Sequence, residues 1–211
     1  MVGSMLNPET EDVGNIICLE HVNLTIPDQS IATEFYLKVL GGTRDPYLMV
    51  GVENMWVNLG GQQFHLPTNE PQVLYGHIGL VTPNLDTLKT RLKSAGRGLA
   101  DTQFSWSEDA GCIEVIGPWG NKFRCCEPDE TSGDMMLGIT YVEFLVERGN
   151  AECIGKFYRD VFGAPSTLSY GNELPAVRIT VGVNQALVFQ ETHDAIPVYD
   201  GHHIAIYTSD F

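Results

Sequence analysis

Histidine recurs at the entrance of predicted strands in this chain. It occurs in three short segments, LEHVNLTIP (19–27), YGHIGL (75–80) and DGHHIAIY (200–207). A neutral imidazole is a common ligand for divalent transition metals and exchanges protons near neutral pH. Three such residues, His21, His77 and His203, stand at repeating intervals. The pattern predicts a duplicated element that presents the same side chain at the same structural position.

The segments around these histidines repeat one order of elements. In the first, a strand (16–27) and a helix capped by Asp28 precede three strands, predicted at 46–52, 54–59 and 61–67. The second has a strand (77–83), a helix (84–96), and strands at 99–105, 112–117 and 122–127. The third has a strand (140–146), a helix (151–164), and strands near 167–171, 176–182 and 185–191. The repeated unit is therefore βαβββ.

Two helices also share a sequence signature. FYLKVLGG (35–42) ends the first helix and FYRDVFGA (157–164) ends the third, while HHIAI (202–206) opens a fourth unit. Repetition of a supersecondary unit predicts a fold built by duplication. We therefore expect an α+β protein with three βαβββ modules plus the first strand of a fourth, paired into curved mixed sheets.

Composition limits the classes of partner. The 211-residue chain has a formal net charge of −15, which argues against binding to nucleic acid or to an anionic membrane. Its apolar runs are shorter than a membrane span requires. Residues 1–15 lack the basic start and apolar core of a signal peptide, and we expect them to form a flexible tail.

The five cysteines are odd in number and form no CxxC motif. We expect them to be reduced and mostly buried, in a cytoplasmic protein. Cys125 and Cys126 are adjacent on a predicted strand and point to opposite faces, so they are poorly placed to share a metal.

Four motifs carry a resemblance to a known superfamily: HVNLTIPD, FYLKVLGG, GHIGLVTPNLD and GPWGNKF. Together they resemble the vicinal oxygen chelate superfamily, which includes glyoxalase I, bleomycin-resistance proteins and extradiol dioxygenases. The resemblance covers about residues 16–211. It implies that two modules pair into a cup that holds a divalent metal. The expected domains are 16–129 (modules 16–72 and 73–129) and an incomplete 136–211 (module 136–197 and the start of a fourth, 198–211).

The resemblance also implies metal-ligand positions, at the start of the first strand and on the last strand of each module. The first cup offers His21, His65, His77 and Arg124. A guanidinium has no lone pair to give a metal, so we expect the three histidines to bind Fe, Mn, Ni, Co or Zn. The alternative is a vestigial site without metal. The second site, made of Tyr141, Gln190 and His203, is expected to be degenerate.

Arg124 has two interpretations. It could point into the cup and orient an anionic substrate, or it could pair with Glu114 across the PWGN hairpin. The family's general-base glutamate is missing, which counts against glyoxalase or epimerase activity. We therefore expect a metal-dependent dioxygenase or lyase that acts on a small, oxygen-rich anion chelated to the metal.

Two other functional hypotheses stand beside this one. The first is a non-catalytic, bleomycin-resistance-type protein that binds a small molecule without metal. The second is a structural or partner-binding role for the degenerate half. Because the third module lacks a complete partner, its apolar face should be exposed, which predicts either homodimerisation through the C-terminal half or poor solubility.

Overall fold

The computed structural model describes residues 14–48, 53–170 and 174–209. The first module comprises β1 (Ile16–Asn23), α1 (Gln29–Ala32) continuing as the π-helix η1 (Thr33–Val39), β2 (Thr43–Arg44), β3 (Asn54–Leu59) and β4 (Gln62–Pro67). The second comprises β5 (Gly76–Val81), α2 (Leu85–Lys93), the short 3₁₀ helix η2 (Arg97–Leu99), β6 (Ser105–Asp109), β7 (Cys112–Ile116) and β8 (Lys122–Cys126).

The third module comprises β9 (Gly138–Glu147), α3 (Ala151–Phe162), β10 (Ser166–Tyr170), β11 (Pro175–Gly182) and β12 (Gln185–Thr192), and β13 (His203–Thr208) begins the fourth. The predicted order of elements is thus confirmed for the described residues. Parts of the predicted strands 46–52 and 167–171, most of the 1–15 tail, and residues 210–211 lie outside them.

Two predicted strands were misplaced. The described part of 46–52, residues 46–48, is not a strand, and the strand at this place in the order is β2 (Thr43–Arg44). Residues 99–105 were expected to be extended, but the strand begins only at Ser105 as β6. Ala110 and Gly111 have positive φ angles of 47° and 83° and form the tight turn between β6 and β7. The turn fixes which residues face β7, so the strand lies further along the chain than the pattern suggested.

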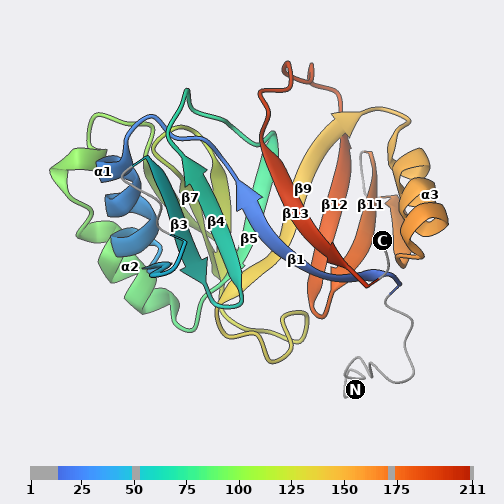
Figure 1. The fold of residues 1–211 in the computed structure, drawn as a ribbon, viewed down its shortest axis with the longest axis horizontal. Helices are drawn as coiled ribbons and strands as arrows, with labels where there is room; N and C mark the ends of the chain where they lie inside the picture. Colours follow the sequence, from blue (N-terminus) through green and yellow to red (C-terminus); the bar gives the residue numbers. More distant parts are fainter. Residues whose placement is uncertain (1–13, 49–52, 171–173, 210–211) are drawn as a thin grey trace.

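The strands form two mixed sheets (Figure 1). One has five strands in the order β13-β1-β4-β3-β2, and the other has eight in the order β10-β11-β12-β9-β5-β8-β7-β6. Parallel pairs such as β1–β4 and β5–β8 alternate with antiparallel ones. The predicted fold class, α+β with βαβββ modules paired into mixed sheets, is confirmed.

The modules pair differently from the expectation. β1 runs antiparallel to β13, so the first module pairs with the start of the fourth. β5 runs antiparallel to β9, so the second module pairs with the third. A domain made of modules 16–72 and 73–129 is therefore not a paired unit. Each first strand carries a similar apolar pattern, so the repeat defines the modules without selecting their partners.

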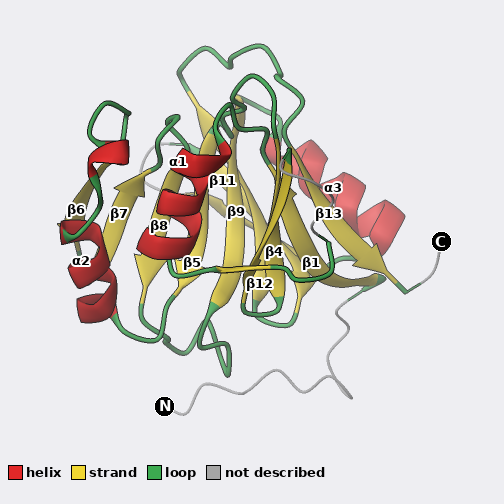
Figure 2. Cartoon of the chain, turned by 60° about the vertical axis from the view of Figure 1, so that its left-hand side comes forward, coloured by secondary structure: helices red, strands yellow, loops and turns green. Residues whose placement is uncertain are grey.

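The apolar faces of the two sheets share one core. Buried aromatic side chains from both sheets and from the first helix meet there: Phe35, Tyr36, Phe64 and Phe123. Figure 2 draws α1 and its continuation in front of β8, and the ring of Phe35 contacts that of Phe123 on this strand. The buried amide of Gln185 joins the sheets, because it donates to Leu19 O and Ile139 O and accepts from Leu19 N. The polar faces consequently point away from the core.

Helix ends follow the predicted capping residues. Asp28 Oδ1 accepts hydrogen bonds from Ser30 N and Ile31 N, and Asn84 Oδ1 accepts one from Thr87 N. Gly41, with φ of +85°, ends the first helix in a conformation that favours glycine. These local signals position the helices against the core side of the sheets.

The cysteines correct one expectation. Cys112 and Cys126 form a disulfide, with Cα atoms 4.5 Å apart, where reduced thiols were expected. They lie at adjacent ends of the antiparallel pair β7–β8, and the hairpin between them brings them together. Cys18, Cys125 and Cys153 are free. Among the described residues, no helix has both the length and the apolar character needed to cross a membrane.

Candidate functional site

Histidines from three strands gather on the polar face of the five-stranded sheet. Strand register places Asn23 on β1 beside His203 on β13 and beside His65 on β4. His21 lies two residues before Asn23. We call this group of His21, His65 and His203 the histidine face. The pairing of β1 with β4 brings His21 and His65 together, and the pairing of β1 with β13 adds His203.

The rings of the histidine face are close neighbours. The ring centroid of His21 is 5.8 Å from that of His65 and 6.4 Å from that of His203. Trp56 on β3 stacks on His65 at 3.9 Å with an interplanar angle of 12°. Trp56 therefore fixes the plane of the His65 ring.

Each of these rings has one nitrogen held by an oxygen acceptor. His21 Nδ1 contacts the Glu20 carboxylate, His65 Nε2 lies 2.7 Å from Asn54 Oδ1, and His203 Nδ1 lies 3.2 Å from Gly201 O. A neutral imidazole that donates from one nitrogen keeps a lone pair on the other. Metal-binding histidines are typically oriented by such acceptors. The imidazoles of the histidine face are therefore ligands of a type that divalent transition metals accept.

Burial lowers the pKa of His65 to about 4, and the neighbouring charges of His21 and His203 act in the same direction. His65 is consequently neutral at physiological pH, which is the form that binds metals. As the side chains stand, no three His, Cys, Asp or Glu groups of the described residues are close enough to share one ion. A shared metal requires the rings to move closer together, and His203 is the exposed member of the group.

His77 does not belong to this group. It lies on β5 in the other sheet, where its Nδ1 is 3.0 Å from Glu143 Oε1 and its Nε2 is 2.7 Å from the Tyr141 hydroxyl. The expected set of His21, His65 and His77 is thus not brought together. Both nitrogens of His77 have partners, so this second position does not fit a metal.

Arg124 adopts the alternative that was weighed against substrate binding. Its guanidinium pairs with Glu114 on the neighbouring strand and lies 3.2 Å from Asp109 Oδ2. Its side chain is nevertheless 29% exposed and lines a cavity. Arg124 is therefore anchored by two carboxylates on β6 and β7 while one part of it faces the solvent.

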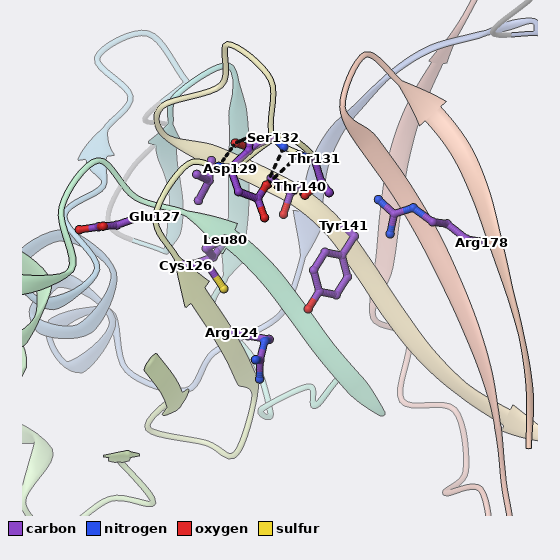
Figure 3. Close-up of a pocket in the computed structure, with 11 residues that line it drawn as sticks. Leu80, Arg124, Cys126, Glu127, Asp129, Thr131, Ser132, Thr140, Tyr141 and Arg178 are labelled. Atoms are coloured by element: carbon purple, nitrogen blue, oxygen red, sulfur yellow. Dashed lines mark hydrogen bonds between the residues drawn. The ribbon is translucent and has the colours of Figure 1, made fainter. Parts of the chain in front are cut away.

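That cavity has a volume of about 340 Å³ and lies on the polar face of the eight-stranded sheet. Its walls include Leu80, Val81, Arg124, Cys126, Glu127, Asp129, Thr131, Ser132, Thr140, Tyr141 and Arg178. Figure 3 shows the Tyr141 ring between the guanidinium groups of Arg124 and Arg178. Burial, with the Glu143 charge, raises the pKa of Tyr141 to about 12. The phenol is therefore neutral at physiological pH.

Sequence reasoning missed two residues of this face, Glu143 and Arg178. Glu143 pairs directly with His77 across β5 and β9, and it follows Tyr141 on the same strand face. The alternation of side chains along β9 places Glu143 on the same face as Tyr141. Only the strand register shows that Glu143 lies beside His77. Arg178 comes from β11, two strands beyond β9.

Gln190 has a local structural role. Its amide nitrogen lies 3.3 Å from both Leu174 O and Pro175 O and 3.0 Å from Glu191 O. These bonds tie the end of β12 to the start of β11. The predicted second site divides accordingly: Tyr141 joins His77, His203 joins the histidine face, and Gln190 secures a strand end.

Comparisons with known proteins find likeness in structure only. No protein-family model matches the chain, and no curated protein sequence matches it significantly. Glyoxalase I from Zea mays superposes with a TM-score of 0.60 at 14% identity, covering 89% of this chain and 70% of the maize chain. A "putative dioxygenase" from Bacillus subtilis superposes with a TM-score of 0.57 at 16% identity, covering 91% of this chain and 68% of that one.

Identities this low establish the fold and leave the reaction open. The two superpositions nevertheless cover 91% and 89% of this chain. The expected resemblance is confirmed at this level: the chain has the fold of the vicinal oxygen chelate superfamily.

Proposed function

We propose that this protein is a metal-dependent enzyme, a dioxygenase or lyase, whose divalent ion is held by His21, His65 and His203. The observation that carries this proposal is the set of three imidazoles, each with one nitrogen oriented by an oxygen acceptor. In this set of ligands, His203 takes the place of His77, which was expected from the sequence. Nitrogen ligands suit Fe, Mn, Ni, Co or Zn.

The chain's own residues would divide the work as follows. His21, His65 and His203 hold the ion, which supplies a Lewis acid and open coordination positions to a small anionic substrate. The Glu20 carboxylate contacts Nδ1 of His21 and would orient that ring. Trp56, stacked on His65, limits ring rotation. Because the set contains no carboxylate ligand, the bound ion keeps its full charge and favours an oxygen-rich anion.

The test is metal content by elemental mass spectrometry on protein prepared without a polyhistidine tag. We expect about one equivalent after reconstitution with iron, manganese, nickel, cobalt or zinc, and its loss in His65→Ala and in His203→Ala. His77→Ala is the matched control and should retain the metal. Retention by His203→Ala, or no metal in the wild type after reconstitution, would overturn the proposal. A metal-loaded protein should then be screened for oxygen consumption with catechols and enolisable keto acids.

A metal-free ligand-binding function is the second candidate. The cavity of about 340 Å³ on the eight-stranded sheet favours it, because its arginines and hydroxyls offer ligand contacts that need no metal. This candidate predicts ligand binding that survives treatment with a chelator. The enzyme hypothesis and the binding hypothesis are thus separated by the dependence of binding on metal.

Homodimerisation stays a prediction, but its basis changes. The third module is not left unpaired, because β9 joins β5. The outer strand of the five-stranded sheet is β13, which pairs on one side only within the described residues, and its Tyr207 is 57% exposed. Edge strands are ready to pair with another chain. We expect a dimer through β13, and sedimentation of a monomer at high concentration would contradict it.

A further inference from the structure

Three side chains form a hydrogen-bonded chain across the polar face of the eight-stranded sheet. The Glu143 carboxylate is 3.0 Å from His77 Nδ1, and His77 Nε2 is 2.7 Å from the Tyr141 hydroxyl. Tyr141 in turn lines the cavity. The chain therefore connects an imidazole outside the cavity to a phenol in its wall.

Strand register makes this arrangement possible. Tyr141 lies opposite Gly79, and Glu143 lies opposite His77, on adjacent strands. A Cβ on Gly79 would lie 2.0 Å from Tyr141 Cε1, so the glycine leaves the space that the phenol ring occupies. The ring can then lie across β5 and reach His77.

The protonation state of His77 decides what Tyr141 offers to the cavity. Glu143 accepts the Nδ1 proton, so the Nε2 of a neutral His77 must accept the Tyr141 O–H. The phenol oxygen then presents only lone pairs to a ligand. When His77 takes up a proton, Nε2–H donates to the phenol oxygen instead, and the Tyr141 O–H is free to donate to a bound anion.

Positive charge in the cavity is unevenly neutralised. Arg124 already pairs with Glu114 and Asp109. The side chain of Arg178, though exposed, makes no hydrogen bond or ion pair with another side chain among the residues that the structure describes. Arg178 and Tyr141 nevertheless line the same cavity. In a chain of net charge −15, this guanidinium is a place where an anion is favoured.

The rest of the cavity wall defines the ligand further. Leu80 and Val81 contribute apolar surface beside the two arginines. Asp129 Oδ1 accepts hydrogen bonds from Thr131 and Ser132, so this oxygen is engaged within its own loop. A ligand with one anionic head and a small apolar body matches these walls, and a planar carboxylate matches the guanidinium fork.

We propose that this cavity binds a small organic carboxylate between Arg178 and Tyr141, and that binding is coupled to uptake of one proton by His77. The groups that face His77 are Glu143 and Tyr141 on β9. On β8, Phe123 pairs with Ile78. Lys122 immediately precedes Phe123, and Arg124 is the next residue on the same face as Lys122. The site is separate from the histidine face and needs no metal.

Coupling of this kind has a definite sign. Because the complex holds one more proton than the free protein, the affinity rises as the pH falls, by at most tenfold per pH unit. Glu143 stabilises the protonated imidazole in the complex. The Lys122 and Arg124 charges oppose it, so Glu143 is the residue that sustains the coupling.

The experiment is calorimetric titration of chelator-treated protein with benzoate, and with neutral benzamide as the matched probe, between pH 5.5 and 8.5. We expect benzoate to bind, benzamide not to bind, and measurements in buffers of different ionisation enthalpy to give uptake of about one proton. Absence of benzoate binding, or binding without proton uptake, would overturn the proposal. Tighter binding of phenyl phosphate than of benzoate would overturn the carboxylate assignment.

Variants separate the two parts of the proposal. Arg178→Gln should weaken benzoate binding at least tenfold, whereas Arg148→Gln, an exposed arginine after β9, should leave it unchanged. His77→Gln should still bind benzoate but without dependence on pH in this range. Wild-type affinity in Arg178→Gln, or wild-type pH dependence in His77→Gln, would contradict the assigned roles. Metal content plays no part in these readouts, so they stand apart from the enzyme hypothesis.

Discussion

The ring of Tyr141 occupies the space that a side chain on Gly79 would need. A Cβ at Gly79 would lie 2.0 Å from Cε1 of Tyr141 and 2.6 Å from Cζ, well inside the contact distance of real Cβ atoms. Strand β5 therefore supplies both His77 and, at Gly79, the space that the ring of Tyr141 occupies.

We predict that Gly79→Ala displaces Tyr141 and destabilises the protein by about 1–3 kcal/mol, the usual cost of forcing extra volume into a packed site. It should also break the Tyr141–His77 hydrogen bond, which an NMR titration of His77 would detect. Gly98→Ala is the control, since no atom lies within 4 Å of a Cβ at that position. Equal stability of the two variants in urea would contradict the prediction.

Much of this fold could be predicted from local signals. Helix caps such as Asp28 and Asn84, and the repeated strand entrances, act over a few residues and were visible in the sequence. The pairing of modules was not visible, because β5 and β1 carry similar patterns and each requires an antiparallel partner. The choice of β9 for β5 is made by packing over the whole domain.

In the candidate site too, single residues could be identified from the sequence but their grouping could not. His21, His65 and His203 were each identifiable as family ligand positions, yet their grouping depends on the pairing of β1 with β13. His77 occupies an equivalent position in its own module and has different neighbours. Arg178 gave no local signal, because its relevance comes from lining the same cavity as Tyr141, from a strand separated from β9 by β12.

Gln185 gives a test of how the two sheets are held together. Its buried amide bonds to the backbone of Leu19 and of Ile139. We predict that Gln185→Met, which has a similar volume, costs about 1–3 kcal/mol because backbone groups lose their partner while buried. Gln185→Glu keeps an acceptor for Leu19 N but donates to neither carbonyl, so it should also destabilise. A wild-type urea midpoint for the methionine variant would show that only packing matters there.

The disulfide between Cys112 and Cys126 should be detectable by thiol counting. In the unfolded, non-reduced protein we expect alkylation of three cysteines, and of five after reduction. In the native protein Cys153 is exposed and should react first. Burial raises the pKa of the Cys125 thiol to about 12, so this thiol should react only on unfolding. Five reactive cysteines without reductant would contradict the disulfide.

Removal of that disulfide has an expected cost. It joins residues separated by 14 positions, and a loop of about this length is worth roughly 3 kcal/mol in the chain-entropy account. We predict that Cys112→Ser with Cys126→Ser lowers the free energy of unfolding by up to this amount. Because Cys126 also lines the cavity, benzoate affinity of the double variant measures whether the bridge shapes the pocket.

Acid should weaken the loop that borders the cavity. Hydrogen bonds from Thr131, with others from the backbone, lower the pKa of Asp129 below its ordinary value of 3.8. A carboxyl whose pKa is lowered in the folded state stabilises the protein fully at pH values above its ordinary pKa. This contribution is lost as the pH falls through the folded-state pKa. Asp129→Asn should therefore differ from the wild type most at pH 5–7, and the difference should shrink as the pH falls below the ordinary pKa of 3.8. The exposed Asp134→Asn serves as the control, and a difference that stays constant with pH would contradict the prediction.

Metal binding should be visible as stabilisation, independently of any activity. An ion that binds only the folded state at 100 times its dissociation constant adds about 2.7 kcal/mol to the free energy of unfolding. We predict that one of the divalent ions raises the melting temperature of the wild type, that a chelator reverses the rise, and that His203→Ala abolishes it. His77→Ala should respond like the wild type, because His77 lies in the other sheet with Tyr141 and Glu143 as its partners. A response lost in His77→Ala and kept in His203→Ala would mean that the ion binds at the eight-stranded sheet instead.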